Sequence, residues 1–547
     1  MNKILGLLFS LIVVTSPIVS QSIPYHVDNE AVYSFVDELA NLSVIDDNQT
    51  IKPYSRMQIA NWLSEANGNV KLTTRQQREI EFYLKDFNKE LQTGKAFKKR
   101  FDLFYFSDSL VKISANLIGG LTLLHNGESL AMHRTNGAEL FTTYGKHLGI
   151  YASLRDNYES DKLGGQSILS QRRGVVYKGD FGEQDYSEAR GGITYSWNWG
   201  TVGLQKDHFV WGSGYNGTLI FSGHTPSFTY LSLKLKPTKW FELNYIHGWL
   251  VSEVVDSSLS YNYYEGMQRT RKVNRSKYIA ANILTFKPWK KLDVSLGNSI
   301  VYGDVDINPT YLIPLLFYKS ADHTYNSNDN DLGQNAQMFM DISSHQLPYT
   351  HLYFSAFVDE ISFKRMFDAS KQSNYVSAKI GARVSGLVPN MSFTAEYTRI
   401  NPMVYQHVIE TTTFESNHYT LGHYLKDNAD ELFLQVRWKP LRGLDLQASL
   451  TKIRKGKDYE SIISNNEVAL YPEINTDEPR WGLPFMNEIR MKQTQLVLKA
   501  TYQIWNDAYM FAEARHLSFS GADATLYTAP YFLQGKNILS FGANFGF

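Results

Sequence analysis

The chain of 547 residues contains no cysteine. This absence excludes disulfide bonds, thiolate metal sites, a cysteine nucleophile and a lipid anchor attached through cysteine. Proteins that pass through an oxidising compartment often lack the residue. The absence is therefore compatible with an exported protein.

Long apolar runs are also missing after the first twenty residues, which excludes transmembrane helices. The mean hydropathy is −0.32, so the chain is polar on average. Membrane-spanning strands stay possible, because their apolar signal is hidden in alternation. The first residues read as a secretory signal peptide, with Lys3 as the basic region and Ile4–Val14 as the apolar core. We expect residues 1–20 to be removed before Gln21.

Neither sign of charge is in excess, since Lys plus Arg and Asp plus Glu both number 54. This balance gives no indication of a nucleic-acid partner. Catalytic motifs are absent as well, because the chain has no His-Glu-x-x-His and no Gly-x-Ser-x-Gly. We therefore predict no catalytic residue, no metal and no cofactor. A hydrolase would need a Ser/His/Asp or Asp/His site at the rim of a strand, and the sequence alone leaves that alternative open.

Helical periodicity marks residues 21–100. Asn29–Val44 carries apolar residues at helical spacing, and Ser55 opens a second amphipathic segment. A third helix begins near Thr74, which with Gln77 resembles a capping box. The sequence thus predicts a small bundle of three helices.

From about Ser109 onward the apolar residues recur with a period of two. In Leu444–Leu450 the aliphatic side chains face one way, and Asp445, Gln447 and Ser449 face the other. Charges on the covered face of every strand would destabilise a soluble core, because buried unpaired charge is costly. In a wide barrel the same face lines a wet lumen.

The last residues, Asn537–Phe547, form such a strand and end on an aromatic residue. Outer-membrane barrels usually end this way, because the final strand closes the barrel and shows an aromatic girdle to lipid. Aromatic residues make up 14% of the chain, and the 35 tyrosines suit both membrane interfaces and sugar-binding surfaces.

Turns and loops alternate along the chain. Lys-Pro pairs within 235–240, 286–291 and 438–443 indicate tight turns, because proline cannot continue a ladder. Long polar segments lie between strand pairs, near 157–188, 251–275, 302–349, 399–429, 453–489 and 517–536. Short turns at one end and long loops at the other are the layout of an outer-membrane barrel, with the long loops extracellular and both termini periplasmic.

These observations predict an all-β transmembrane barrel of about 16–18 antiparallel strands, preceded by a small N-terminal α-helical bundle. The expected division is a signal peptide at 1–20, a periplasmic helical bundle at 21–100 and an outer-membrane barrel at 101–547.

One glycine- and aromatic-rich stretch, residues 203–222, contains the candidate contacts for a polysaccharide. As a loop folded into the lumen, it could stack its aromatic rings on sugar faces while its ionisable groups bond to hydroxyls. The candidates are Lys206, Asp207, His208, Trp211 and Tyr215. The alternative for the same stretch is a structural plug or a girdle loop.

A second stretch, Asn308–Tyr318, has prolines that interrupt an apolar run and indicates a buried loop. An Asp/Asn cluster follows it, at Asp322, Asn328, Asp329 and Asn330. Such oxygens can bind calcium, but the spacing is not that of an EF-hand, so a solvated loop is the better interpretation.

Three segments resemble the Wzi-type outer-membrane capsule-assembly proteins: Lys52–Ala60, Lys206–Tyr215 and Asn308–Pro314. The resemblance covers nearly all of the mature chain. It implies a barrel of about eighteen strands with a helical bundle at its periplasmic end. It also implies a protein that holds or organises capsular polysaccharide and is not an enzyme. It identifies no polymer-contacting residue. The helical region is also similar to half of an S-layer-homology unit, which would imply contact with cell-wall polymer.

The expected function is therefore binding of a capsular or exopolysaccharide at the cell surface, without catalysis. Outer-membrane lipid is the second expected partner. A porin-like channel for small solutes shares every barrel feature and is the main alternative. A hydrolase that uses His208 or Asp207 is a weaker one.

Overall fold

The computed structural model describes residues 22–46, 50–94, 97–178, 184–264, 268–325, 333–361, 363–364, 366–371, 373–407, 409–459 and 482–546. The predicted signal peptide, the Asn328–Asn330 part of the Asp/Asn cluster and Phe547 lie outside the described residues.

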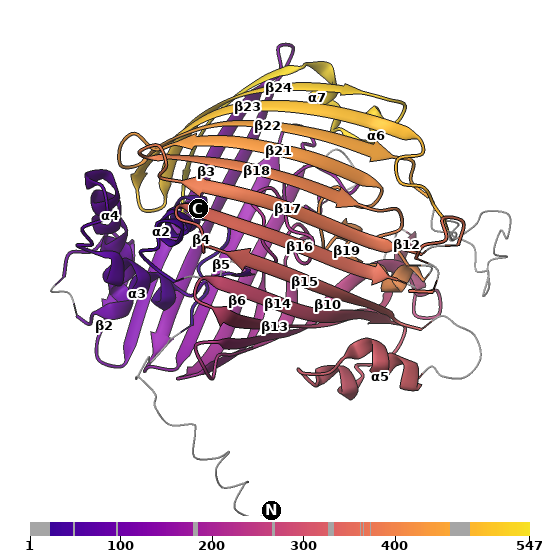
Figure 1. Ribbon diagram of the computed structural model, residues 1–547, viewed down its shortest axis with the longest axis horizontal. Coiled ribbons are helices and arrows are strands. Elements are labelled where there is room, and N and C mark those ends of the chain that lie inside the picture. Colours follow the sequence, from indigo (N-terminus) through magenta and orange to yellow (C-terminus); the bar gives the residue numbers. More distant parts are fainter. Residues whose placement is uncertain are drawn as a thin grey trace, which may run out of the picture.

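The strands form one closed antiparallel barrel of 18 strands (Figure 1). This confirms the predicted fold class. Each strand pairs with the next along the chain, and β25 pairs with β3 to close the ring. The barrel strands are β3 (Val111–His125), β4 (Leu130–Tyr144), β5 (Leu148–Glu159), β6 (Asp185–Trp197), β7 (Gly200–Asp207), β9 (Phe228–Leu235), β10 (Phe241–Val255), β13 (Asn274–Trp289), β14 (Leu292–Gly303), β15 (Asn335–Ser344), β16 (Thr350–Glu360), β17 (Tyr375–Ser385), β18 (Met391–Ile400), β21 (Ala429–Trp438), β22 (Leu444–Gly456), β23 (Ile489–Trp505), β24 (Ala508–Ser520) and β25 (Asn537–Phe545).

Two strands share the closing edge of β3. The short strand β2 (Phe104–Ser107) pairs with Lys112–Ala115, and β25 pairs with Gly119–His125. The chain therefore enters the barrel just before the predicted point near Ser109, and its last strand completes the same edge.

The alternation of side chains is as predicted. On β23, Leu496 and Leu498 are 44% and 52% exposed, and Lys499 points into the lumen. On β25, Leu539 and Phe541 are exposed on the outer face. The outer wall is apolar because the outward-facing residues of neighbouring strands lie opposite one another, as Leu498, Ala514 and Leu539 do.

Connections differ between the two ends of the barrel. At the short-turn end, the tight links include 236–240 and 439–443, as the Lys-Pro pattern predicts. The third Lys-Pro pair lies slightly differently, because Pro288 belongs to the end of β13, where the register with β14 shifts. The long-loop end carries the long connections, and their short elements are η2 (Glu410–Thr412), β19 (Glu415–Ser416), β20 (Tyr419–Thr420), α6 (Ala524–Tyr527) and α7 (Pro530–Gln534).

Three helices precede the barrel, as predicted: α2 (Glu30–Asn41), α3 (Arg56–Ala66) and α4 (Thr74–Leu91). Ser55 caps α3 by accepting a hydrogen bond from the Gln58 N–H. The capping box of α4 is formed by Thr73 and Gln76, one residue before the predicted pair. Among the described residues, none of the helices combines the length and hydrophobicity that crossing a bilayer requires.

The helices cover the short-turn end of the barrel (Figure 1). The Asn41 side chain donates to Ser385 Oγ at 2.9 Å, and the Tyr83 hydroxyl donates to Gln503 Oε1 at 2.9 Å. Arg75 Nε donates to Asn390 Oδ1 at 2.9 Å. The bundle is thus held to several strands around the rim by polar contacts.

One long connection lies on the outside of the barrel. Its helices η1 (Pro309–Leu312) and α5 (Tyr318–Tyr325) cover the outer face of β10, β13 and β14 (Figure 1). The Tyr245 hydroxyl donates to the Tyr311 carbonyl at 3.0 Å, and the Tyr318 N–H donates to Asn298 Oδ1 at 2.9 Å. We call residues 309–325 the outer cover.

The outer cover corrects the prediction of a buried loop. Tyr311 and Tyr318 are buried, but four apolar neighbours are 40–65% exposed: Leu312, Ile313, Leu315 and Phe317. The stretch has two apolar sides. One side packs against the barrel, and the other side faces away from it. Polar groups of the wall such as Asn282 and Asn298 need hydrogen-bond partners, and the cover supplies them.

The apolar outer wall leads to a stability prediction. Leu498→Arg places a charge near the middle of β23 on the outer face, and this should lower the free energy of unfolding in lipid vesicles by about 2–4 kcal/mol. Lys499→Arg, one residue along and facing the lumen, is the matched control and should change it little. Equal effects in denaturant titrations would contradict the assignment of faces.

Candidate functional site

The connection between β7 and β9, residues 208–227, crosses the lumen, and we call it the plug segment. Its strand β8 (Val210–Trp211) pairs with β1 (Ile51–Lys52), which precedes the helix α3. Gly212 N–H donates to the Thr50 carbonyl at 2.8 Å. The plug segment and the N-terminal region are therefore joined inside the barrel.

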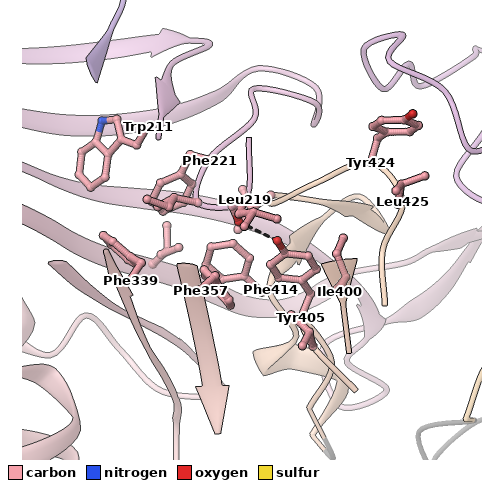
Figure 2. Close-up of a cluster of buried hydrophobic side chains, with 14 of the residues drawn as sticks. Trp211, Leu219, Phe221, Phe339, Phe357, Ile400, Tyr405, Phe414, Tyr424 and Leu425 are labelled. Atoms are coloured by element: carbon pink, nitrogen blue, oxygen red, sulfur yellow. Dashed lines mark hydrogen bonds between the residues drawn. The ribbon is translucent and has the colours of Figure 1, made fainter. Parts of the chain in front are cut away.

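An apolar cluster surrounds the plug segment (Figure 2). Trp211 and Phe221 of the plug segment pack at a ring-centroid distance of 5.2 Å, and both reach the wall residue Phe339. From the long connection 401–428, the Tyr405 hydroxyl donates to the Leu219 carbonyl at 2.7 Å. The part of the lumen around these residues is filled by apolar side chains, whereas the inward charges on the strands predicted a wet lumen.

Charged groups of the wall bind the backbone of the plug segment. Glu396 accepts hydrogen bonds from the Tyr215 N–H at 2.5 Å and the Asn216 N–H at 3.0 Å. Lys379 Nζ lies 3.0 Å from Glu396 Oε2 and donates to the carbonyls of Asn216 and Gly217 at 2.9 and 2.7 Å. Both side chains are fully buried. The ion pair and the backbone of residues 215–217 thus provide hydrogen-bond partners for one another.

A second wall carboxylate, Asp341, binds the plug segment at Ser213. Asp341 accepts from the Ser213 N–H at 2.7 Å, the Ser213 hydroxyl at 2.7 Å and the Thr50 hydroxyl at 2.9 Å. Gly217, next to the ion pair, has φ +83°, a backbone conformation that residues other than glycine rarely adopt. The glycine-rich stretch is therefore shaped to meet the opposite wall.

The five predicted sugar contacts all belong to this region, and each has a partner within the protein. Lys206 donates to the Ala189 carbonyl and Ser227 Oγ. Asp207 accepts from the Tyr151 hydroxyl and the His208 N–H, Trp211 is buried in the apolar cluster, and the Tyr215 hydroxyl contacts His351. The sequence is compatible with either a sugar-contacting loop or a structural plug at 203–222, and the observed contacts are those of a plug. A polysaccharide contact by these residues stays a prediction.

Imidazoles and carboxylates meet where the N-terminal segment reaches the plug segment. Arg173 Nε donates to Asp28 Oδ1 at 2.9 Å. Burial opposes ionisation of Asp28, but Arg173 outweighs it and lowers the pKa of this carboxyl to about 2. Burial, together with nearby guanidinium groups, holds the pKa values of His26 and His208 well below the usual range. Both imidazoles are therefore neutral at physiological pH. Among the described residues, His26, Asp207 and His208 are spaced to hold a metal.

An exposed aromatic hairpin stands at the long-loop end, between β10 and β13. Its strands are β11 (Tyr261–Tyr264) and β12 (Gln268–Arg271). Tyr261 and Tyr263 are 52% and 37% exposed, and the Arg271 guanidinium lies 5.8 Å from the Tyr261 ring centroid. Lys272 follows and is exposed as well. Here rings and cations face solvent, unlike those of the plug segment.

The second predicted stretch contributes less. Asp322 is buried in the outer cover, where its carboxylate accepts from the Tyr311 hydroxyl at 3.3 Å. The other members of the Asp/Asn cluster lie outside the described residues. Sequence reasoning missed the wall residues that hold the plug segment. Their only signal was a charge at an inward position of the alternation.

Fold and site together define a class: a large membrane-type β-barrel whose lumen is closed by its own chain. The sequence model of the capsule assembly protein Wzi family matches residues 126–514. The chain belongs to this family and is an outer-membrane β-barrel, as the three resembling segments indicate.

A solved structure agrees with the fold. The Escherichia coli outer-membrane protein Wzi, described as a carbohydrate-binding β-barrel involved in group 1 capsule assembly, aligns with a TM-score of 0.57 and 11% identity, over 96% of this chain and 100% of that one. At this identity the likeness establishes the fold alone. OccAB1 of Acinetobacter baumannii aligns with a TM-score of 0.44 and 11% identity, over 80% of this chain and 96% of that one. OprD of Pseudomonas aeruginosa aligns with a TM-score of 0.41 and 10% identity, over 79% and 94%. At such scores these two carry no argument. No curated protein matches the sequence significantly.

The buried ion pair predicts how the plug can be released. Glu396→Gln removes the ion-pair partner of Lys379, and breaking one partner of such a pair costs about 3–5 kcal/mol. We expect the plug segment to detach and the closed barrel to conduct ions in a planar bilayer.

Glu431→Gln is the matched control, because this carboxylate bonds to the Asn216 side chain and is not the ion-pair partner of Lys379. It should leave the barrel closed. Conductance that is equally low in both variants and the parent would mean that the ion pair does not hold the plug segment.

Proposed function

We propose that this protein binds or organises a capsular or exopolysaccharide at the outer face of the outer membrane, without catalysis. The observation that carries this proposal is the plug: a lumen filled by residues 208–227 suits a surface-binding protein better than a channel. Family membership supports the same role, since the family is one of capsule assembly. The carbohydrate binding described for the E. coli protein makes a sugar polymer the natural ligand class.

We propose an orientation with the long loops outside the cell and both termini in the periplasm. Short turns at one end and long loops at the other support it, because outer-membrane barrels share this asymmetry. In this division residues 1–20 are a signal peptide, 21–100 a periplasmic helical bundle and 101–547 the barrel. A contact between the bundle and cell-wall polymer belongs to the same proposal, and outer-membrane lipid covers the apolar wall.

The polymer-contacting surface in this proposal consists of Tyr261, Tyr263, Arg271 and Lys272, the exposed residues of the aromatic hairpin. Exposed tyrosine rings can stack on sugar faces, as the aromatics of ligand sites do. The cations Arg271 and Lys272 beside them favour an anionic polysaccharide. The five residues predicted from the sequence, Lys206 to Tyr215, remain proposed contacts, and their present partners favour a role in positioning the plug.

Absence of catalysis is part of the proposal. Asp207 and His208, the residues of the hydrolase alternative, are both 3% exposed, so a polymer outside the barrel has no direct path to them. Alanine replacement of either residue should leave polymer length unchanged. Loss of a depolymerising activity in these variants would favour the hydrolase.

Deleting the gene tests the surface role. Polysaccharide synthesis should continue, and the polymer should appear in the medium instead of on the cells, because only attachment is removed. Cell-bound and released polymer are measured after centrifugation. Unchanged surface attachment in the deletion strain would rule the proposal out.

The hairpin is tested by replacing both exposed rings, Tyr261→Ala with Tyr263→Ala. Truncation of a central aromatic contact costs about 2 kcal/mol, which corresponds to at least tenfold weaker binding of the cell's own purified polysaccharide. Tyr261→Phe with Tyr263→Phe keeps the rings and is the control. If both double variants bind like the parent, the contact surface lies elsewhere.

A further inference from the structure

Three potential metal ligands meet inside the barrel, although they come from distant parts of the chain. His26 belongs to the segment before α2, Asp207 ends β7, and His208 begins the plug segment. All three ligand atoms lie within 4.8 Å of one another. His26 is largely buried, and the other two are 3% exposed.

The distances fit a tetrahedral ion. His26 Nε2 lies 3.2 Å from His208 Nδ1 and 3.5 Å from Asp207 Oδ1. Zinc bonds to imidazole nitrogen and carboxylate oxygen are about 2.0–2.2 Å long, so adjacent ligands of a tetrahedral site are about 3.4 Å apart. These two distances fit adjacent ligands of such a site, and the third pair, Asp207 and His208, lies within 4.8 Å. The three ligand atoms can therefore form one face of the site after an adjustment of that pair.

A carboxylate lies near the second nitrogen of each imidazole. His26 Nδ1 accepts a hydrogen bond from the Asp28 N–H at 3.2 Å and lies 3.4 Å from Asp28 Oδ2, and His208 Nε2 lies 3.5 Å from Glu188 Oε1. Zinc on His26 Nε2 would place the ring proton on Nδ1, where Asp28 Oδ2 can accept it. Metal-bound histidines almost always donate their other N–H to a carboxylate or carbonyl, which orients the ring. Without an ion, His208 Nε2 is buried and has no hydrogen-bond partner. Ion binding would direct this N–H at Glu188.

The surrounding charges balance before an ion binds. Three carboxylates, Asp28, Glu188 and Asp207, face three cations, and Arg173 is already paired with Asp28. Arg190 Nη1 lies 4.0 Å from Asp207 Oδ1, and Lys206 also acts on Asp207 and Glu188. A divalent ion would therefore join a cluster whose formal charges cancel. A cavity of about 80 Å³ is lined by His26, Asp207 and Arg190, which leaves room for water as a fourth ligand.

We propose that His26, Asp207 and His208 form a zinc site that fastens the N-terminal segment to the plug segment. Two imidazoles and one carboxylate suit Zn²⁺ better than Ca²⁺ or Mg²⁺, which prefer oxygen ligands alone. The bound ion links the segment that leads into α2 to the start of the plug. The site is independent of how the protein binds polysaccharide.

Calorimetry on the full chain in detergent micelles, after removal of metals with a chelator, tests the site with ZnCl₂. We expect one saturable site per chain and a higher melting temperature with zinc. His26→Ala and His208→Ala should lose both effects. Glu188→Gln should weaken zinc binding by about 10–100-fold, because it removes an orienting carboxylate. His516→Ala, at an exposed histidine on β24, is the matched control and should bind like the parent.

Absence of saturable binding to the parent, or parent-like binding by His26→Ala, would overturn the proposal and leave a hydrogen-bonded histidine pair. A measurement on the unaltered protein covers the case in which the variants do not fold. Crystals soaked in ZnCl₂ should show an anomalous diffraction peak at the zinc edge between the three side chains. A peak only at exposed histidines, or none, would equally overturn the site.

Discussion

The ion pair between Lys379 and Glu396 is the contact on which the closed lumen depends. A barrel of this width would by itself leave an aqueous channel. Here the plug segment brings carbonyl and N–H groups to the two buried charges, and the Tyr353 hydroxyl of the wall also donates to Glu396. In turn, the backbone at 215–217 can lie in the lumen only because those charges bond to it. The buried charges of the wall and the backbone of the plug segment therefore stabilise each other.

Because the plug segment fills the lumen, the exposed surfaces at the long-loop end are the ones that a ligand can reach. The plug and the loops packed on it bury most rings of the lumen, as Figure 2 shows for Trp211, Phe221 and Tyr405. The tyrosines of the β11–β12 hairpin remain available outside. On the outer wall, the outer cover forms hydrogen bonds with polar side chains that would otherwise face lipid.

The N-terminal region has a structural role beyond covering the short-turn end. Through β1 and Thr50 it pairs with the plug segment, and through His26 it reaches the junction of β7 and the plug. A zinc ion at this junction would join the helical bundle, the barrel wall and the plug segment at one point.

The sequence by itself determined the barrel, the three helices, the tight turns and the outward faces, because each follows from local periodicity or from residues a few positions apart. Leu498 and Lys499 could be assigned to opposite faces from alternation alone. Pairings between distant residues could not be read this way. Nothing in the sequence indicates that Glu396 receives the backbone of Tyr215, that Asp341 meets Ser213, or that His26 lies beside His208. Only the closed ring of strands decides these contacts, since it fixes which inward side chains face one another across the lumen. The tertiary structure thus placed the predicted sugar-contact stretch inside the barrel as a plug and left the exposed rings of the hairpin at its surface.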